Sequence, residues 1–134
     1  MNILVIDAQG GGIGKQVITA VKQRFPEYEI TAAGTNSAAT SAMIKAGADH
    51  AATGENAVVV GCRRADVIVC PIGAVIADAL YGEITPAMAL AVGQSGAKRI
   101  LIPVNHCDNI IAGVSDLSIT SLIDDVLNKL SELG

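Results

Sequence analysis

The chain has 134 residues, of which 51% are hydrophobic, 2% aromatic and 16% charged, and its formal net charge is -4. This length is typical of one domain, so residues 1–134 are expected to fold as a single domain. The hydrophobic content excludes a disordered chain, and the acidic balance with scattered Lys and Arg excludes a nucleic-acid-binding surface.

The two uncharged apolar runs that best fit a membrane span, residues 67–77 and 86–97, are shorter than the roughly 20 residues that a membrane-spanning helix needs. The N-terminus lacks the basic region and cleavage site of a signal peptide. Three cysteines without paired spacing do not indicate a disulfide framework. These features predict a cytoplasmic protein without a membrane partner.

Apolar runs that fit β-strands alternate with helical patterns along the chain. Strands are expected over residues 2–6, 29–33, 48–52, 66–70 and 99–104. Helices are expected over residues 13–25, 37–46, 54–64 and 86–94, and from 119 onward. The expected helix starts are marked by Asn36 or Ser37, Thr53 or Gly54, Thr85 before Pro86, and Ser118. Residues 74–84 fit either a short helix or an irregular excursion.

Alternating strands and helices favour a parallel sheet with right-handed crossovers. The simplest arrangement is an α/β, three-layer, Rossmann-like doubly wound sheet of about five strands in the order 3-2-1-4-5. Ligands of such sheets bind beyond the carboxyl ends of the strands, where the strand order reverses. The residues expected at that crevice are 7–12, 34–37, 71–73 and 105–108.

A glycine-rich loop follows the first strand and opens the first helix, with the sequence Gly10, Gly11, Gly12, Ile13, Gly14. Glycines let the backbone approach an oxyanion, and a helix N-terminus offers free N–H groups. The loop therefore predicts binding of a phosphorylated small molecule, such as NAD(P) or another nucleotide. The alternative is that the glycines only form a tight turn between strand and helix.

The loop does not match the exact motifs of better-known phosphate sites. Lys15 stands where the third glycine of the dinucleotide fingerprint belongs, and the acidic residue expected at the end of strand 2 is absent. The short-chain dehydrogenase pair is also missing, since Thr85 follows Tyr81 where Lys is needed. Gln16 replaces the Mg²⁺-binding hydroxyl of a P-loop, which excludes Mg²⁺-dependent hydrolysis by this loop.

Other polar residues fall at the expected crevice. Glu55 and Asn56 fit contacts to a ribose or to a substrate, while the alternative is helix capping with Thr53 as the cap. Asp78 and Glu83 flank Tyr81 and fit acid–base chemistry or ordinary solvation. The complete set of expected binding residues is Asp7, Gly10, Gly11, Gly12, Ile13, Gly14, Thr35, Asn36, Ser37, Glu55, Asn56, Gly73 and Asn105.

A Cys beside a His can indicate a nucleophile or a metal site, and His106 and Cys107 follow the fifth strand. Neighbouring residues in a loop tend to point apart, and no further ligand spacing completes a metal site. A polar loop ending at Asp108 is therefore the favoured interpretation, with no metal site. Asn105 is retained as a crevice residue because it directly follows the strand.

Short motifs spread over nearly the whole chain resemble one family of short bacterial proteins. The likeness rests on residues 6–7, 10–14, 34–37, 39–41, 52–57, 71–73, 82–88 and 102–105. The family is catalogued as domain of unknown function 3842. The resemblance implies a Rossmann-like fold and no particular activity.

Three functions remain open from the sequence. The first is a binding protein that holds a nucleotide or other phosphorylated small molecule at the glycine loop. The second is a small enzyme on a polar metabolite, with Glu55, Asn56, Glu83 or Asn105 in the site; the third is an interaction module without a ligand. The apolar segment 72–92 predicts a homo-oligomer, because a contiguous exposed apolar patch usually marks an interface.

Overall fold

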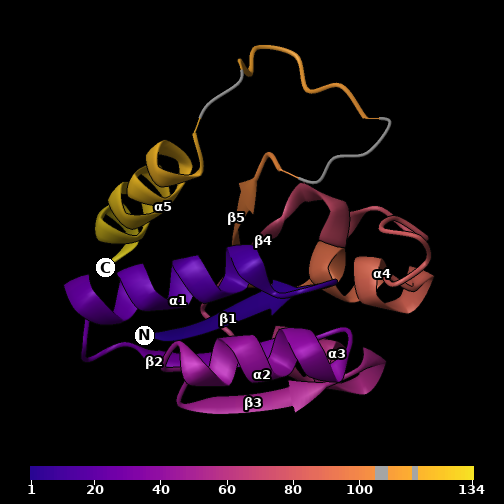
Figure 1. Cartoon of the computed structure of the whole chain (residues 1–134), viewed down its shortest axis with the longest axis horizontal. Helices are drawn as coiled ribbons and strands as arrows, with labels where there is room; N and C mark the ends of the chain where they lie inside the picture. Colours follow the sequence, from indigo (N-terminus) through magenta and orange to yellow (C-terminus); the bar gives the residue numbers. More distant parts are fainter. Residues whose placement is uncertain (105–108, 116–117) are drawn as a thin grey trace.

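The protein is described here from a computed structural model, which covers residues 1–104, 109–115 and 118–134. In chain order the elements are β1 (Asn2–Asp7), α1 (Gly12–Arg24), β2 (Glu29–Gly34), α2 (Ser37–Lys45), β3 (His50–Thr53), α3 (Glu55–Arg64), β4 (Val67–Pro71), the 3₁₀ turn η1 (Ile72–Val75), α4 (Pro86–Gln94), β5 (Lys98–Ile102) and α5 (Ile119–Leu133). The five strands form one parallel sheet in the order β3-β2-β1-β4-β5. The predicted fold class and strand order are confirmed (Figure 1).

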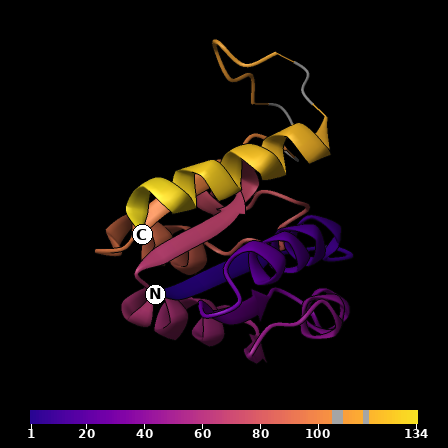
Figure 2. The same cartoon turned by 90° about the vertical axis from the view of Figure 1, so that its left-hand side faces the viewer.

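Helices cover both faces of the sheet, because successive side chains of a strand point to opposite faces. Ile3 and Val5 of β1 join the core shared with α1, α2 and α5. Leu4 and Ile6 of the same strand join the core shared with α3, η1 and α4. In this arrangement α5 packs beside α1, and Figures 1 and 2 place both chain termini at one end of the molecule.

Local capping signals fix most helix starts. The side chains of Asn36, Thr85 and Ser118 accept hydrogen bonds from the amides of Ala39, Met88 and Ser121, which confirms these residues as N-caps. The prediction of Thr53 as the cap of α3 is wrong. Gly54, with a φ of 105°, is the N-cap, and the Thr53 hydroxyl instead pairs with that of Thr40 at 2.7 Å.

The third strand begins two residues later than expected, because the end of α2 extends into the connection. The amides of Gly47 and Ala48 still donate to the carbonyls of Ile44 and Met43. Of residues 74–84, for which a short helix and an irregular excursion were the two expectations, 74 and 75 belong to η1 and the rest form an irregular excursion that continues to residue 85. Within the described residues, no helix is both long and apolar enough to cross a membrane.

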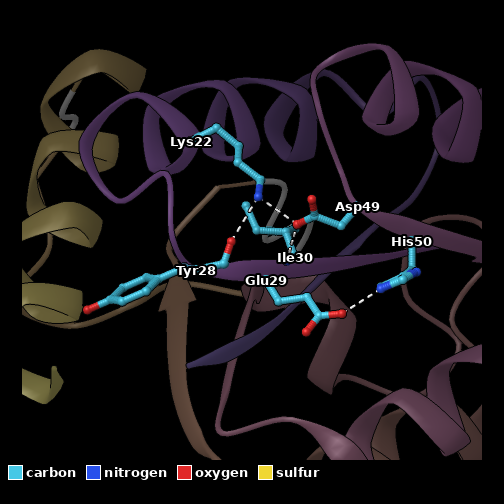
Figure 3. Close-up of polar contacts among 6 residues, drawn as sticks. All are labelled: Lys22, Tyr28, Glu29, Ile30, Asp49 and His50. Carbon is cyan, nitrogen blue, oxygen red and sulfur yellow. Dashed lines mark hydrogen bonds and ion pairs between the residues drawn. The ribbon is translucent and has the colours of Figure 1, made fainter.

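Polar side chains contact one another at the end of the sheet where the strands begin (Figure 3). Lys22 Nζ donates to the carbonyl of Tyr28 at 2.8 Å and to Asp49 Oδ2 at 2.6 Å. Asp49 Oδ2 also accepts from the amide of Ile30, which ties α1 to β2 and to the start of β3. Beside them His50 Nε2 pairs with Glu29 Oε1. Lys22 and Asp49 therefore form an ion pair at this end of the sheet, and Glu29 has His50 as its hydrogen-bond partner.

Candidate functional site

The glycine loop lies at the opposite end of the sheet, between β1 and α1. Gly11 is its tightest point: the amide of Gly11 donates to the carbonyl of Ala8 at 3.0 Å, and its φ is 73°. A Cβ at Gly11 would lie 2.8 Å from the Cα of Ala39 in α2. Glycine is therefore required there by packing as well as by backbone conformation.

Gly10 and Gly12 differ from Gly11, because a Cβ built on either meets nothing within 4 Å. Both residues are exposed. Within residues 1–104, 109–115 and 118–134, neither amide has a hydrogen-bond acceptor. These two N–H groups are thus available donors at the start of a helix, where a partial positive charge adds to their attraction for anions.

Asp7, the last residue of β1, supports the loop from inside. Its side chain is only 3% exposed, and its carboxylate accepts from the amides of Ala8 at 2.8 Å and Gly14 at 2.6 Å. Burial raises the pKa of Asp7 above its ordinary value, while the amides of Gly14, Ala8 and Ile13 act in the opposite direction. The observed role of Asp7 is to hold the turn; contact with a ligand stays a prediction for it.

Glu83 reaches the glycine loop from the segment between η1 and α4. Its Oε2 accepts from the amide of Gln9 at 2.9 Å. Its Oε1 accepts from Asn36 Nδ2 at 2.6 Å and from Thr35 Oγ1 at 3.3 Å. One carboxylate therefore joins the loops that follow β1 and β2. The sequence singled out Glu83, Thr35 and Asn36 separately and placed Gln9 in the expected crevice range 7–12, but it did not indicate the contact between the Gln9 amide and Glu83.

Residues 76–85, here named the strap, carry Glu83. Asp78, Leu80 and Tyr81 have φ values of 65°, 57° and 58°, and Gly82 follows at 85°. Leu80 and Ile84 are 4% and 1% exposed and anchor the strap in the core, whereas Tyr81 is fully exposed. Left-handed backbone at non-glycine residues is uncommon and clusters at functional sites.

Glu55 and Thr85 link the strap to α3. Thr85 Oγ1 donates to Glu55 Oε1 at 2.6 Å while it also caps α4. Asn56, the next residue of α3, is exposed, as is Ser37 at the start of α2. Their contact with a ligand stays a prediction.

The remaining expected residues lie deeper or outside the described chain. Ile13 is half-buried against the core, and Gly14 and Gly73 are buried. Asn105, together with the predictions for His106, Cys107 and Asp108, lies outside the described residues. At the carboxyl ends of the strands, hydrogen bonds therefore join the loops after β1, β2 and β3 to one another and to the strap.

Metal and thiol chemistry find no support in the described part of the chain. No three His, Cys, Asp or Glu side chains there are arranged to hold a metal ion. Cys62 and Cys70 are buried, and burial raises their thiol pKa values to about 11 and about 12. Both thiols are therefore protonated at neutral pH and are poor nucleophiles.

With this geometry in hand, comparison with known proteins places the chain in a family. The family model described as Domain of unknown function (DUF3842) matches residues 2–133. The chain belongs to this family. The resemblance drawn from the sequence motifs is thereby confirmed. No curated protein matches this DUF3842 member.

One solved structure similar to this DUF3842 protein is the crystal structure of a dodecameric FMN-dependent Ubix-like decarboxylase from Escherichia coli O157:H7. The two chains are 16% identical, and the match covers 98% of this chain and 95% of the other, with a TM-score of 0.54. At this identity the likeness supports the fold alone.

Proposed function

We propose that this protein binds a phosphorylated small molecule of the nucleotide class, with the phosphate group over Gly10 and Gly12. The observation that carries the proposal is the pair of amides without acceptors in the described part of the chain, on two exposed glycines beside the N-cap of α1. Neighbouring donors already bind an anion of the chain itself, since Gln9, Thr35 and Asn36 hold the Glu83 carboxylate. This loop ends β1, next to the point at which the strand order reverses, where such sheets bind ligands.

The structural neighbour suggests which nucleotide to test first. It is described as FMN-dependent, and FMN carries one terminal phosphate that would suit two exposed amides. NAD(P), adenine nucleotides and sugar phosphates are the other members of the panel. No described residue supports assigning a reaction, so the enzyme hypothesis with Glu55, Asn56, Glu83 or Asn105 stays secondary.

The test compares each phosphorylated compound with its dephosphorylated partner, such as FMN with riboflavin and AMP with adenosine. A ligand that binds only the folded state stabilises it by about 2.7 kcal/mol at a hundredfold excess over Kd, which thermal unfolding detects. Native mass spectrometry of the purified protein identifies any ligand retained from the cell. If no phosphorylated compound shifts the melting temperature more than its partner does, the proposal is wrong.

Gly12 offers the matched variants that locate the site. Gly12→Glu places a negative charge at the first position of α1, which favours the helix but repels a phosphate. Gly12→Gln has nearly the same shape without the charge. Binding of FMN or of whichever compound the panel selects is expected to weaken about tenfold in Gly12→Glu relative to Gly12→Gln, a difference of about 1.4 kcal/mol. Gly11 is unsuitable for this test, because any side chain there collides with α2 whether or not a ligand binds.

Self-association is part of the same proposal. α4 carries no charged residue, Leu90 on it is 57% exposed, and a hollow between α3 and α4 is lined by Val59, Ala87, Leu90 and Ala91 among others. The structural neighbour is described as dodecameric. Light scattering is expected to give a mass above the 13.6 kDa of one chain, and Leu90→Arg is expected to lower it. Ile44→Arg on α2 is the matched control, and a monomeric wild-type protein at micromolar concentration contradicts this part.

A further inference from the structure

The carboxylate of Glu83 lies where an anionic ligand would find its donors. The three groups that donate to it come from the end of β1 and the start of α2: the Gln9 amide, the Thr35 hydroxyl and the Asn36 side-chain amide. Gln9 directly precedes Gly10, one of the two residues with free amides. The strap therefore places a negative charge next to the phosphate position of the proposed function.

The Asn36 side chain and the backbone of Gln9 and Thr35 have other hydrogen bonds besides those to Glu83. Asn36 Oδ1 accepts from the amide of Ala39 as the N-cap of α2, which leaves Nδ2 to donate to Glu83 Oε1. Asn36 Nδ2 also donates to the carbonyl of Gln9 at 2.9 Å, and the amide of Thr35 donates to the carbonyl of Asp7 at 3.1 Å. If Glu83 moved away, the rest of the fold would still hold these donors together.

A ligand phosphate and the Glu83 carboxylate cannot share this place at low cost. Like charges a few ångströms apart repel each other, and the repulsion grows in a partly dehydrated crevice. Glu83 is half-buried there and has no cation within ion-pair distance in the described part of the chain. The donors that contact its carboxylate in the described part of the chain are all uncharged.

The tip of the strap, residues 81–83, is exposed or half-buried and lies between buried anchors, and the amides of Gly82 and Glu83 donate to the carbonyls of Asp78 and Leu80. Leu80 and Ile84 are buried on either side of it, and Thr85 is fixed as the cap of α4. Between these anchors lie Tyr81, Gly82 and Glu83, with the first two in left-handed backbone conformations. A turn of this tip would withdraw the carboxylate and leave both anchors in place.

We propose that Glu83 is an internal competitor of the ligand: its carboxylate occupies the donors of Gln9, Thr35 and Asn36 in the free protein, and a bound phosphate displaces it and moves the tip of the strap. This inference rests on the proposed function and adds its regulation. Binding at the glycine loop is thereby coupled to the conformation of residues 81–83.

Glu83→Gln tests the competition directly, with inorganic pyrophosphate and FMN as probes. The variant keeps the shape of the side chain but removes its charge, so pyrophosphate is expected to bind at least about fivefold tighter than to the wild type, measured by titration calorimetry. Glu27→Gln is the matched control, because it removes the same charge from an exposed residue at the opposite end of the sheet. Glu83→Ala serves as the second variant, and urea unfolding confirms that each protein is folded.

Tyr81 reports the movement of the strap. The chain has no Trp and only two Tyr, so Tyr81 is the sole emitter in a Tyr28→Phe protein. Phe at position 28 preserves the stacked pair that Tyr28 forms with Phe25 at 4.7 Å. Colourless pyrophosphate is expected to change the anisotropy of Tyr81 in this protein, and the change is expected to shrink when Glu83→Ala is added.

Four outcomes overturn the inference. Weaker binding to Glu83→Gln would mean that the carboxylate helps to hold the ligand, and an affinity equal to that of Glu27→Gln would mean that it plays no part. If FMN binds in preference to riboflavin but Glu83 variants change nothing, the competition fails while the proposed function stands. If no variant binds any phosphorylated probe, both fail.

Discussion

The carboxylates at the two ends of the sheet have different kinds of hydrogen-bond partner. At the amino-terminal end, Asp49 and Glu29 are paired with Lys22 and His50. At the carboxyl-terminal end, no Lys, Arg or His lies within ion-pair distance of Asp7 or Glu83 among the described residues, and both are held by N–H and O–H donors. Because a group of uncharged donors suits an anion, this difference supports the proposal that the ligand binds at the carboxyl-terminal end.

The largest expected loss of stability comes from substitution of Asp7. Asp7→Ala removes the acceptor of the buried amides of Ala8 and Gly14, and an unsatisfied buried donor costs about 1–3 kcal/mol. The free energy of unfolding, measured in urea, is expected to fall by about 3 kcal/mol. A loss below about 1 kcal/mol would show that the turn holds without the carboxylate.

The pH dependence of Asp7 has a defined sign. Because burial raises its pKa in the folded state above the ordinary value of 3.8, the folded protein favours the neutral acid. The stability that this group contributes is complete below pH 3.8 and is lost as the pH rises through the raised value. The stability of the wild type relative to Asp7→Asn is therefore expected to decrease over that range, measured by urea unfolding at a series of pH values.

Gly11 and Gly12 provide the next largest contrast. Gly11→Ala forces a Cβ to within 2.8 Å of the Ala39 Cα at a positive φ, so a loss of about 2 kcal/mol is expected. Gly12→Ala meets open space in the first turn of α1, so stability is expected to stay within about 0.5 kcal/mol of the wild type or to rise. Equal losses in thermal unfolding would remove the distinction between a packed and an open glycine.

The parts of this structure that the sequence predicted are those set by local patterns. Alternating strands and helices determine the strand order through the handedness of the crossovers, and Asn36, Thr85 and Ser118 cap helices through contacts three residues away. The glycine loop was found for the same reason. Its position after the first strand is a local feature.

The central contact of the crevice could not be predicted in this way. Glu83 and Gln9 are 74 residues apart, and one partner is a backbone amide. The strap escapes prediction too, because Leu80 and Tyr81 adopt a left-handed conformation that their side chains disfavour locally and that only the anchored fold imposes. The sequence identified Asp7 as a binding residue. In the structure it is buried, and its carboxylate holds the turn through the amides of Ala8 and Gly14.

Substitution of Asp49 is expected to change stability less, and its effect depends on pH in the opposite direction to that of Asp7. Its hydrogen bond to Lys22, followed by that to the amide of Ile30, lowers the pKa of Asp49 below 3.8. The stability that the Asp49 carboxylate contributes to the fold is present above pH 3.8 and is lost as the pH falls through its lowered pKa. Because the carboxylate is 39% exposed, Asp49→Asn is expected to cost only about 1 kcal/mol at neutral pH.

The matching measurement is urea unfolding of Asp49→Asn and the wild type from neutral pH to about pH 2. The difference between the two proteins is expected to shrink toward the acid end, whereas the difference for Asp7 develops toward the neutral end. If the stability differences for Asp7→Asn and Asp49→Asn changed with pH in the same direction, the two ends of the sheet would not differ electrostatically.

The smallest effect is expected at the pair of His50 and Glu29. Their side chains are 61% and 52% exposed, so solvent weakens the contact between them. Glu29→Gln is expected to change the free energy of unfolding by at most about 0.3 kcal/mol and to leave FMN binding unaltered. If this variant weakened ligand binding as much as Gly12→Glu does, the amino-terminal end would have to be part of the site. An unchanged affinity, with a near-zero change in stability, would instead confine ligand binding to the end where carboxylates are held without cations.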